Sequence, residues 1–337
     1  NLSCLSASRT EYSKSSQMDY SEENINAMLG FVKNYCIKNE FLPIEDNALC
    51  ELLEYSVRLA ERQDKLTTRF GLICDILAEA DAWARLDKFN SIDSKYVLKA
   101  INKSVERVNI YAKKYSKMIS NNEIMIATEG QEVGQINGLC VMEMGDYTFG
   151  MPTRITASTY TGKAGIVNIE KEAEMSGSIH DKGMQVLIGY LGGKYAQKNP
   201  LTLSCRVCFE QSYNGVDGDS ASSTETYAII SSLSECPINQ QLAVTGSMNQ
   251  KGEIQPIGGV TYKIEGFFDV CNERGLTGSQ GCIIPSTNVK DLVLKDEVVS
   301  AVKEGKFHIY AIDSIDDGIE LLMGRKAGKK LDYQYDL

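Results

Sequence analysis

The sequence predicts an α+β fold in which an all-helical unit precedes a mixed domain of strands and helices. Apolar side chains recur at helical spacing through residues 21–120, as they do on the buried faces of amphipathic helices. From residue 121 onward glycine becomes frequent, and the apolar runs shorten into strand-like segments mixed irregularly with helical ones. Because a clean βαβ alternation is missing, we expect α+β architecture, and the length of 337 residues favours two domains.

Four helices are predicted in the first unit. Ser21 is a suitable N-cap for the first, with Glu22 and Glu23 in its first turn, and Pro43 interrupts the pattern that follows. Asp93 is a suitable N-cap for the fourth helix. The residues expected on one face of each helix are Ile25, Met28, Leu29 and Val32; Leu49, Leu52, Leu53, Ser56 and Leu59; Phe70, Ile73, Cys74, Leu77, Ala80 and Ala84; and Val97, Ile101, Val105, Val108 and Ala112.

The mixed domain is predicted over residues 121–324, between two polar ends. Strands are expected at 124–128, 135–144, 155–161, 166–169, 201–209, 241–248, 282–284 and 307–312, and helices at 181–197, after residue 220, at 259–274 and at 316–323. Residues 1–20 are polar and serine-rich, so we expect poor order there. Residues 325–337 form a tail whose basic run, Arg325–Lys330, is expected to be solvated.

The composition limits the partners that the chain can have. A net charge of −10 argues against nucleic acid, which is bound through clustered Lys and Arg. No apolar run is long enough to be a membrane segment. Ten cysteines are scattered without regular spacing in a chain too large to need disulfides, so we expect reduced thiols and a cytoplasmic protein. The chain begins at Asn1, which we interpret as the start of a fragment or a processed product.

Cys205 and Cys208 form a single Cys-x-x-Cys pair within the strand-like run 201–209. A zinc site would need a second pair or nearby histidines, and the chain has two histidines in all. We therefore interpret both residues as strand cysteines in or beside the core.

The stretch from Gly215 to Thr224 suggests a catalytic site. A strand-like run precedes it, a helical pattern follows it, and Ser220 lies at the junction. A side chain in this position faces unpaired backbone N–H groups and the positive end of the helix dipole. Because such groups can stabilise an oxyanion, Ser220 is the candidate nucleophile.

A serine nucleophile needs a base, and the sequence offers three candidates. His180 and His308 are the histidines, and neither lies in a local pattern that links it to Ser220. Lys263 borders an apolar stripe on a predicted helix, where burial would lower its pKa enough to make it a base. The alternative is an amphipathic lysine whose stem packs on the core while its ammonium group reaches water.

Asp217 and Asp219 flank Gly218 immediately before the candidate nucleophile. Asp-x-Asp with glycine is common in turns, where the carboxylates bond to nearby backbone. A calcium loop would need further ligands and a glycine at later positions, where Ala221 and the serines after it stand instead. We therefore predict no metal site here.

Several ordered motifs resemble the Lon protease family, in particular the Lon-related group that includes the archaeal-type enzymes. They are Gly-Asp-Ser-Ala-Ser at 218–222, Thr-Gly-Ser at 245–247, Gly-Glu-Ile-Gln-Pro-Ile-Gly-Gly at 252–259, and Lys263. The resemblance covers roughly residues 124–323. The separation of the serine and the lysine, 263 − 220 = 43 positions, is that of the family's catalytic dyad.

The resemblance implies a role for each matching residue. Ser220 is then the nucleophile, Lys263 the general base and Thr245 the threonine that orients the lysine. Asp217 and Asp219 match acidic positions beside the serine, whose modulating contribution to the site varies within the family. The chain departs from the family pattern at residues 261–262, where Thr-Tyr stands in place of Asn-Glu.

The helical unit resembles the small lid of an AAA+ ATPase module, which precedes the protease domain in Lon proteins. Thr-Thr-Arg-Phe at 67–70 resembles the start of the lid helix that supplies a sensor arginine, so Arg69 is a candidate contact for a nucleotide phosphate; the alternative is an exposed arginine at a helix start. The chain contains no Gly-x-x-x-x-Gly-Lys-Ser/Thr loop. ATP and magnesium are therefore implied only for the complete protein, with the nucleotide-binding half upstream of Asn1.

The resulting hypothesis is a serine endopeptidase of an ATP-dependent protein-degrading machine. The resemblance implies unfolded protein substrates and a hexameric ring. One alternative is a non-catalytic, ring-forming adaptor or chaperone-like module that has kept the fold. Another is an esterase, which would require His180 or His308 within hydrogen-bond reach of Ser220.

Overall fold

The computed structural model describes residues 16–144, 147–197 and 202–328. They form two compact units: one lies within residues 1–110 together with 290–293, and the other within 111–289 together with 294–337. Most of the predicted N-terminal segment 1–20 and of the tail 325–337 lies outside the described residues. Within the first segment, residues 17–19 form strand β1 (Gln17–Asp19), which pairs with β2 (Lys65–Thr67).

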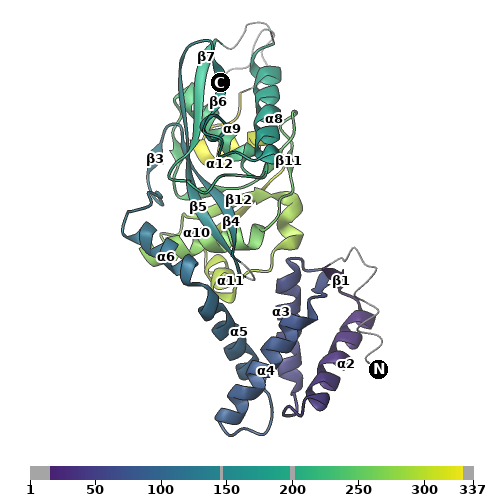
Figure 1. Ribbon diagram of the computed structural model, residues 1–337. Coiled ribbons are helices and arrows are strands. Elements are labelled where there is room, and N and C mark those ends of the chain that lie inside the picture. Colours follow the sequence, from purple (N-terminus) through teal and green to yellow (C-terminus); the bar gives the residue numbers. More distant parts are fainter. Residues whose placement is uncertain (1–15, 145–146, 198–201, 329–337) are drawn as a thin grey trace. The chain divides into compact units, whose positions relative to one another are not determined.

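The first unit is a bundle of helices, as predicted (Figure 1). Its helices are α2 (Glu22–Lys38), α3 (Asp46–Ala60), α4 (Phe70–Leu86) and α5 (Ser94–Val108). Ser21 accepts a hydrogen bond from Asn24 N at 3.3 Å, and Asp93 accepts one from Lys95 N at 3.1 Å, so both predicted N-caps are confirmed. The core comes from one face of each helix and includes Met28, Leu52, Ile73, Leu77 and Val97.

The apolar face predicted for the fourth helix is only partly correct. Val97 is buried, but Val105 and Val108 are 37% and 42% exposed, because only the first half of α5 packs into the bundle. The helix ends at Val108 with Asn109 as its C-cap, and a separate helix, α6 (Ile110–Ser120), follows.

Helix α6 explains why the boundary between the units lies between Ile110 and Tyr111 rather than at residue 120. Ile119 of α6 packs with Ile126 and Val270, both in the second unit. The Tyr115 hydroxyl donates a hydrogen bond to Pro152 O at 2.9 Å. Most of α6 therefore belongs to the mixed domain.

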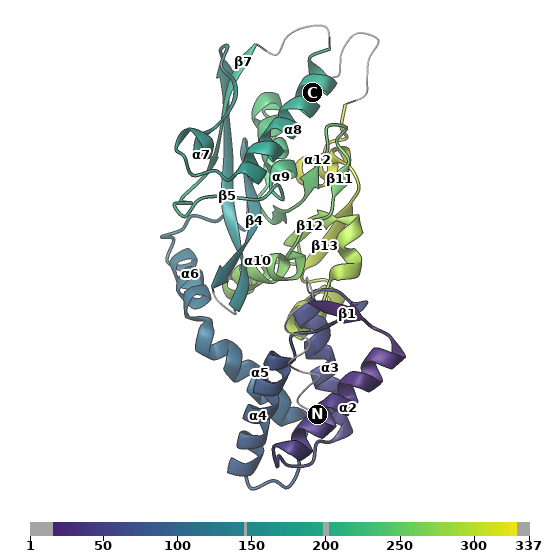
Figure 2. The ribbon, with the colours of Figure 1, turned by 45° about the vertical axis from the view of Figure 1, so that its right-hand side comes forward.

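A mixed sheet of seven strands forms the centre of the second unit, within the described residues (Figure 2). Its order is β13-β12-β9-β4-β5-β7-β6. Strand β5 is antiparallel to β4 and β7, and the other pairs are parallel. The strands are β4 (Gln135–Met144), β5 (Tyr147–Thr161), β6 (Gly165–Asn168), β7 (Leu203–Phe209), β9 (Leu242–Val244), β12 (Gly281–Pro285) and β13 (His308–Ile312). This mixture of directions confirms the α+β prediction.

Helices pack against this sheet and bring the site residues together. They are α7 (Ile169–Glu172), α8 (Ser178–Tyr195), α9 (Ser222–Ser234), α10 (Val260–Arg274), α11 (Asp296–Lys303) and α12 (Ile315–Met323). Helix α9 packs on β4 and β5 and against α8, and Figure 2 shows α8 and α9 beside these long strands. Helix α10 packs on β4, β5 and β12. Two short pairs complete the unit: β3 (Gln131–Glu132) with β8 (Ile238–Asn239), and β10 (Ser247–Met248) with β11 (Ile254–Gln255).

Two strand predictions are wrong. Residues 124–128 are not a strand, because their backbone groups bond to side chains: Ile126 O accepts from Arg274 and Ala127 O from Asn137. The predicted strand 241–248 is split into β9 and β10 at residues 245–246. This interruption lies at the candidate site.

Candidate active site

Ser220 lies in the turn that leads into α9. Its carbonyl oxygen accepts a hydrogen bond from Gly246 N at 2.8 Å. The N–H groups of Ser222 and Ser223 donate to Asp219 O and Gly246 O. Those of residues 219–221 have no acceptor within the part of the chain that the structure describes. As predicted, the candidate nucleophile thus faces uncommitted backbone donors at the start of a helix.

Hydroxyl groups on α9 hold the interrupted strand beside Ser220. The Ser223 side chain donates to Gly246 O at 2.7 Å, and Thr224 donates to Val244 O at 3.2 Å. The Ser222 hydroxyl accepts from Met248 N at 3.2 Å. These bonds satisfy backbone groups at and beside the interruption between β9 and β10. Thr245 lies in this interruption, where its N–H donates to Ile283 O of β12 and its side chain contacts the Ser220 carbonyl.

Lys263 reaches the same point from the first turns of α10. The helix approaches β5 closely because glycines meet there: a Cβ on Gly266 would lie 2.2 Å from Gly150 O, and one on Gly150 would lie 1.8 Å from Tyr262 O. Gly259 begins the helix with a positive φ of 67°, a conformation that favours glycine. Small residues therefore set the depth at which the lysine enters the core.

The three residues make direct contacts. Lys263 Nζ lies 2.8 Å from Ser220 Oγ and 3.2 Å from Thr245 Oγ1. The Thr245 hydroxyl donates to Ser220 O at 3.3 Å, so the same group that contacts the lysine is oriented by the serine backbone. A separation of 2.8 Å between the amine and the hydroxyl is within reach for direct proton transfer.

The lysine is buried rather than amphipathic. Its side chain is 2% exposed, which rules out the alternative in which its ammonium group reaches water. Burial lowers the pKa of Lys263 to about 8, although the nearby Cys140 thiol and the Asp219 carboxylate act in the opposite direction. A substantial fraction of the amine is therefore neutral slightly above neutral pH.

The two aspartates before Ser220 are both exposed but have different hydrogen-bond partners. Asp217 accepts a hydrogen bond from Gly218 N at 2.8 Å, as expected for a turn. Asp219 accepts one from the Ser247 hydroxyl at 2.8 Å. Of the two aspartates, only Asp219 contributes to raising the pKa of Lys263. Within the described ranges, no cluster of three His, Cys, Asp or Glu side chains could hold a metal ion.

Neither histidine is within reach of the nucleophile. The His180 ring contacts Glu225, Ser176 and Asn168. His308 Nε2 contacts Gly278 O at 2.8 Å. The condition for a histidine-based esterase is therefore not met.

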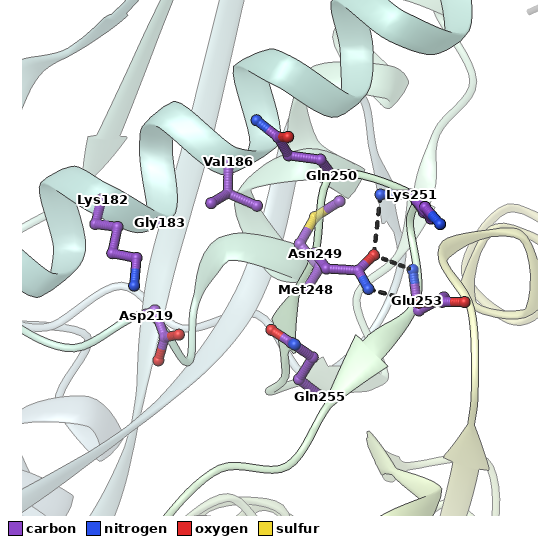
Figure 3. Close-up of a pocket in the computed structure, with 10 residues that line it drawn as sticks. All are labelled: Lys182, Gly183, Val186, Asp219, Met248, Asn249, Gln250, Lys251, Glu253 and Gln255. Carbon is purple, nitrogen blue, oxygen red and sulfur yellow. Dashed lines mark hydrogen bonds between the residues drawn. The ribbon is translucent and has the colours of Figure 1, made fainter.

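A pocket of about 460 Å³ opens beside the Ser220 turn. Val186 and Met248 line it with apolar surface, and Figure 3 shows Lys182 from α8 extending toward Asp219. Asn249 is fixed in its wall by hydrogen bonds with Lys251 N and Glu253. The remaining lining residues are Gly183, Gln250 and Gln255. The pocket can take a side chain that has both apolar and polar parts.

Three other predicted residues take no part in the contacts of this site. Cys205 is buried in β7 and Cys208 half-buried in the same strand, which confirms that they are strand cysteines. Arg69 lies exposed at the start of α4, where its guanidinium donates to Leu59 O at 2.7 Å.

No helix among the described residues is long and apolar enough to cross a bilayer.

Comparison with known families agrees with this geometry. The family described as Lon protease (S16) C-terminal proteolytic domain matches residues 109–325. The chain belongs to the Lon protease family. Residues 43–107 match a second description, archaeal LonB, AAA+ ATPase LID domain, in the helical unit of this Lon chain. The predicted family and the order of lid and proteolytic domain are thereby confirmed.

Curated relatives match this Lon chain over part of their own length. It is 44% identical over 219 residues, 64% of this chain, to an Escherichia coli (strain K12) protein named as a Lon protease homolog. It is 36% identical over 280 residues, 82% of this chain, to a Haemophilus influenzae protein with the same name. It is 30% identical over 318 residues, 91% of this chain, to the archaeal Lon protease of Archaeoglobus fulgidus. The matched regions are 37%, 46% and 47% of these relatives, so the chain spans less than half of each.

Sequence reasoning missed several residues that build the Lon site. Gly150 and Gly266 set the position of α10, and Ser222, Ser223 and Thr224 hold the strand interruption. The run Ser-Ser-Thr directly after the turn was the available signal, because hydroxyl residues in an otherwise buried helix need acceptors. The glycine contact had no local signal, since its two partners are far apart in the chain.

Proposed function

We propose that this chain is the peptidase part of an ATP-dependent protein-degrading machine, with Ser220 and Lys263 as its catalytic dyad. The observation that carries the proposal is the 2.8 Å contact between a nearly inaccessible lysine amine and a serine hydroxyl at a helix start. Membership of the Lon family supports the same chemistry.

The mechanism follows from the contacts around Ser220. Neutral Lys263 accepts the Ser220 proton as Oγ attacks the carbonyl carbon of the scissile peptide bond. Uncommitted N–H groups of the turn stabilise the oxyanion, at a typical value of about 3 kcal/mol per donor. The lysine then protonates the departing amine, and the peptide C–N bond breaks to leave an ester on Ser220.

Deacylation uses the same groups in reverse order. Lys263, again neutral, takes a proton from a water molecule as the water attacks the ester carbonyl. The lysine then returns this proton to Ser220 Oγ as the ester C–O bond breaks, which releases the carboxylic acid product and Ser220. Thr245 holds the lysine amine in place through both steps because its hydroxyl is tied to Ser220 O. The pocket lined by Asp219 and Met248 lies where it can receive a substrate side chain near the cleaved bond.

The test compares the chain with its Ser220→Ala and Lys263→Ala variants on an unfolded protein substrate at pH 8.5. We expect each variant to lose at least about 10⁴-fold in kcat/KM, because the two residues act as a unit. A serine-directed fluorophosphonate should label Ser220 in the unmodified chain but not in the Lys263→Ala variant, in which the dyad is broken. Ser178→Ala removes an exposed serine elsewhere and is the matched control. Normal cleavage by either dyad variant would contradict the proposal.

Nucleotide use is proposed for the complete protein. In this chain the one candidate contact is Arg69, and no phosphate-binding loop accompanies it. These residues alone do not fit an ATP–Mg site, so we assign no catalytic step to nucleotide. Arg69→Ala in the complete protein should lower ATP-dependent degradation while leaving peptide cleavage unchanged, if the arginine acts as a nucleotide sensor.

Assembly and location are also proposals. We propose a hexameric ring acting on unfolded proteins in the cytoplasm, supported by the family and by the lid-like helical unit. Sedimentation of the chain and of the complete protein tests the hexamer. The alternative, a non-catalytic adaptor with the same fold, has no need of an unpaired buried lysine, which costs stability.

A further inference from the structure

The nucleophile turn is connected to a second buried charged group that the proposed mechanism does not use. His180, in the first turn of α8, is 0% exposed, and its Nε2 lies 3.0 Å from Glu225 Oε1, which is also 0% exposed. Its Nδ1 lies 3.0 Å from Ser176 Oγ and 3.3 Å from Asn168 Nδ2. Resting on the proposed function, we propose that His180 and Glu225 are positioning residues that fix the turn carrying Ser220 from both of its ends.

Glu225 holds the end of the turn that follows Ser220. It lies in the first turn of α9, and its backbone N donates to Ala221 O at 2.9 Å. A negative side chain here is favoured by the helix dipole. The bond to His180 therefore connects the start of α9 to the start of α8.

Ser176 holds the end that precedes Ser220. Residues 175–177 pair with Val216: Gly177 N donates to Val216 O at 2.8 Å, and Val216 N donates to Met175 O at 2.9 Å. The Ser176 hydroxyl at the centre of this pairing contacts His180 Nδ1 and donates to Asp181 Oδ1 at 2.7 Å. Through the Ser176 hydroxyl, the histidine is thus connected to the segment that pairs with Val216, four residues before the nucleophile.

Close packing at this junction leaves the turn little freedom. A Cβ on Gly177 would lie 2.2 Å from the Asp217 side chain, and one on Gly183 would lie 3.3 Å from the Asp219 Cβ. The start of α8 therefore supports the acidic part of the turn directly. Any shift of α8 relative to α9 would move Ser220 relative to Lys263.

The charges around His180 favour a shared proton. Glu225 and Glu170 each have one buried carboxylate oxygen with no hydrogen-bond partner within the described residues. Burial alone would lower the pKa of His180, but its hydrogen bond to Glu225 and the charges of Glu225, Glu170 and Asp181 raise it. Burial in turn raises the pKa of Glu225. An imidazolium donates to both Glu225 and Ser176, whose own proton goes to Asp181, although its Nδ1–H then faces the Asn168 amide nitrogen, which is also a donor.

The test removes the hydroxyl that connects Ser176 to His180 but leaves the buried His180–Glu225 pair in place. Ser176→Ala should lower kcat about tenfold with KM unchanged, because Ser220 is less often aligned with Lys263. The rate at which a fluorophosphonate labels Ser220 should fall by the same factor. Ser176→Thr keeps the hydroxyl and should restore both rates. Ser178→Ala, which removes an exposed serine two residues along, is the control.

A second variant covers the case in which Ser176→Ala unfolds. Glu225→Gln keeps the shape and an acceptor for His180 but removes the charge, and it too should lower kcat and the labelling rate without changing KM. Thermal melting of every variant checks folding. Unchanged kcat and labelling in folded Ser176→Ala or, where that variant unfolds, in folded Glu225→Gln would overturn the proposal. If instead the unmodified chain neither cleaves nor labels, the proposed function itself fails.

Discussion

Two buried ionisable side chains flank the Ser220 turn, and their electrostatic surroundings are opposite. Lys263 lies against two hydroxyl groups, whereas His180 lies against a carboxylate. Burial lowers the pKa of the lysine to about 8. Burial is also the largest single effect on the histidine, but the hydrogen bond to Glu225 and the charges of Glu225, Glu170 and Asp181 together outweigh it and raise the pKa of His180. One cation is thereby prepared to lose its proton, and the other to keep it.

The difference teaches that a direct counter-charge, more than burial, decides what such a group can do. An unpaired buried amine costs folding free energy, but its neutral form is a usable base. A paired imidazolium keeps its proton to higher pH than a free one, so it does not serve as the base, and it can hold two helices in register instead. The site combines both because catalysis needs a reactive group and a fixed geometry.

The largest expected effect comes from breaking the pair at its anion. Glu225→Ala should lower the free energy of unfolding by about 3–5 kcal/mol, since it leaves the imidazole buried without its partner. Because the folded pKa of His180 is raised, its contribution is full below the unfolded value of about 6.5 and is lost as pH rises through the folded pKa. Urea denaturation of the chain at pH 6 and pH 9 measures both.

The control for this experiment removes both charges together. The double variant His180→Leu/Glu225→Met should cost much less than Glu225→Ala alone, because a hydrophobic pair leaves no buried charge. Equal losses in the single and double variants would mean that packing, not charge, holds the two helices together.

Removing the lysine should have the opposite sign. Lys263→Met should raise the free energy of unfolding by about 3 kcal/mol at pH 7, which corresponds to lowering the pKa from 10.5 to about 8. Since the folded pKa is lowered, the penalty in the unmodified chain is full below pH 8 and disappears as pH rises to about 10.5. The gain should shrink over that window when denaturation is repeated at pH 10. A variant that is less stable at pH 7 would show that the lysine contacts outweigh its burial.

The pH dependence of cleavage measures the same lysine in the working site. kcat/KM should rise about tenfold per pH unit below pH 8 and level off above it, because only the neutral amine accepts the serine proton. Initial rates on a peptide substrate from pH 6 to 10 give the curve. A profile that is flat across pH 8 would assign the base to another group.

Local sequence patterns were sufficient to predict the Lys263 part of the site but not the His180 part. The Ser220 turn, Thr245 and Lys263 could be located because a loop–helix junction and an apolar helical stripe are readable over short distances, and because their motifs resemble a family. The fold class, the caps at Ser21 and Asp93, and most element positions followed from the same kind of pattern.

The His180 side could not be predicted because tertiary structure alone brings its members together. Glu225 lies 45 positions after His180 and reads in the sequence as a polar residue of a helix. Ser176 reads as part of a turn. The wrong strand at 124–128 has the same cause, since its backbone partners are side chains of distant residues such as Arg274 and Asn137. Patterns of spacing detect neither kind of partner.

The smallest expected effect lies at Asp219, the carboxylate whose charge acts on the pKa of the lysine. Asp219 raises the pKa of Lys263, so Asp219→Asn should move the midpoint of the pH–rate curve to lower pH and raise kcat/KM at pH 7 about twofold. The amide oxygen can still accept from Ser247, which keeps the turn in place. Asp217→Asn is the matched control, because this exposed carboxylate lies two residues away and does not contribute to the pKa of the lysine. If both variants shift the curve equally, the effect is one of general surface charge. Distant charges would then act on the buried Lys263 amine, which contradicts the view that direct neighbours decide its pKa as they decide that of His180.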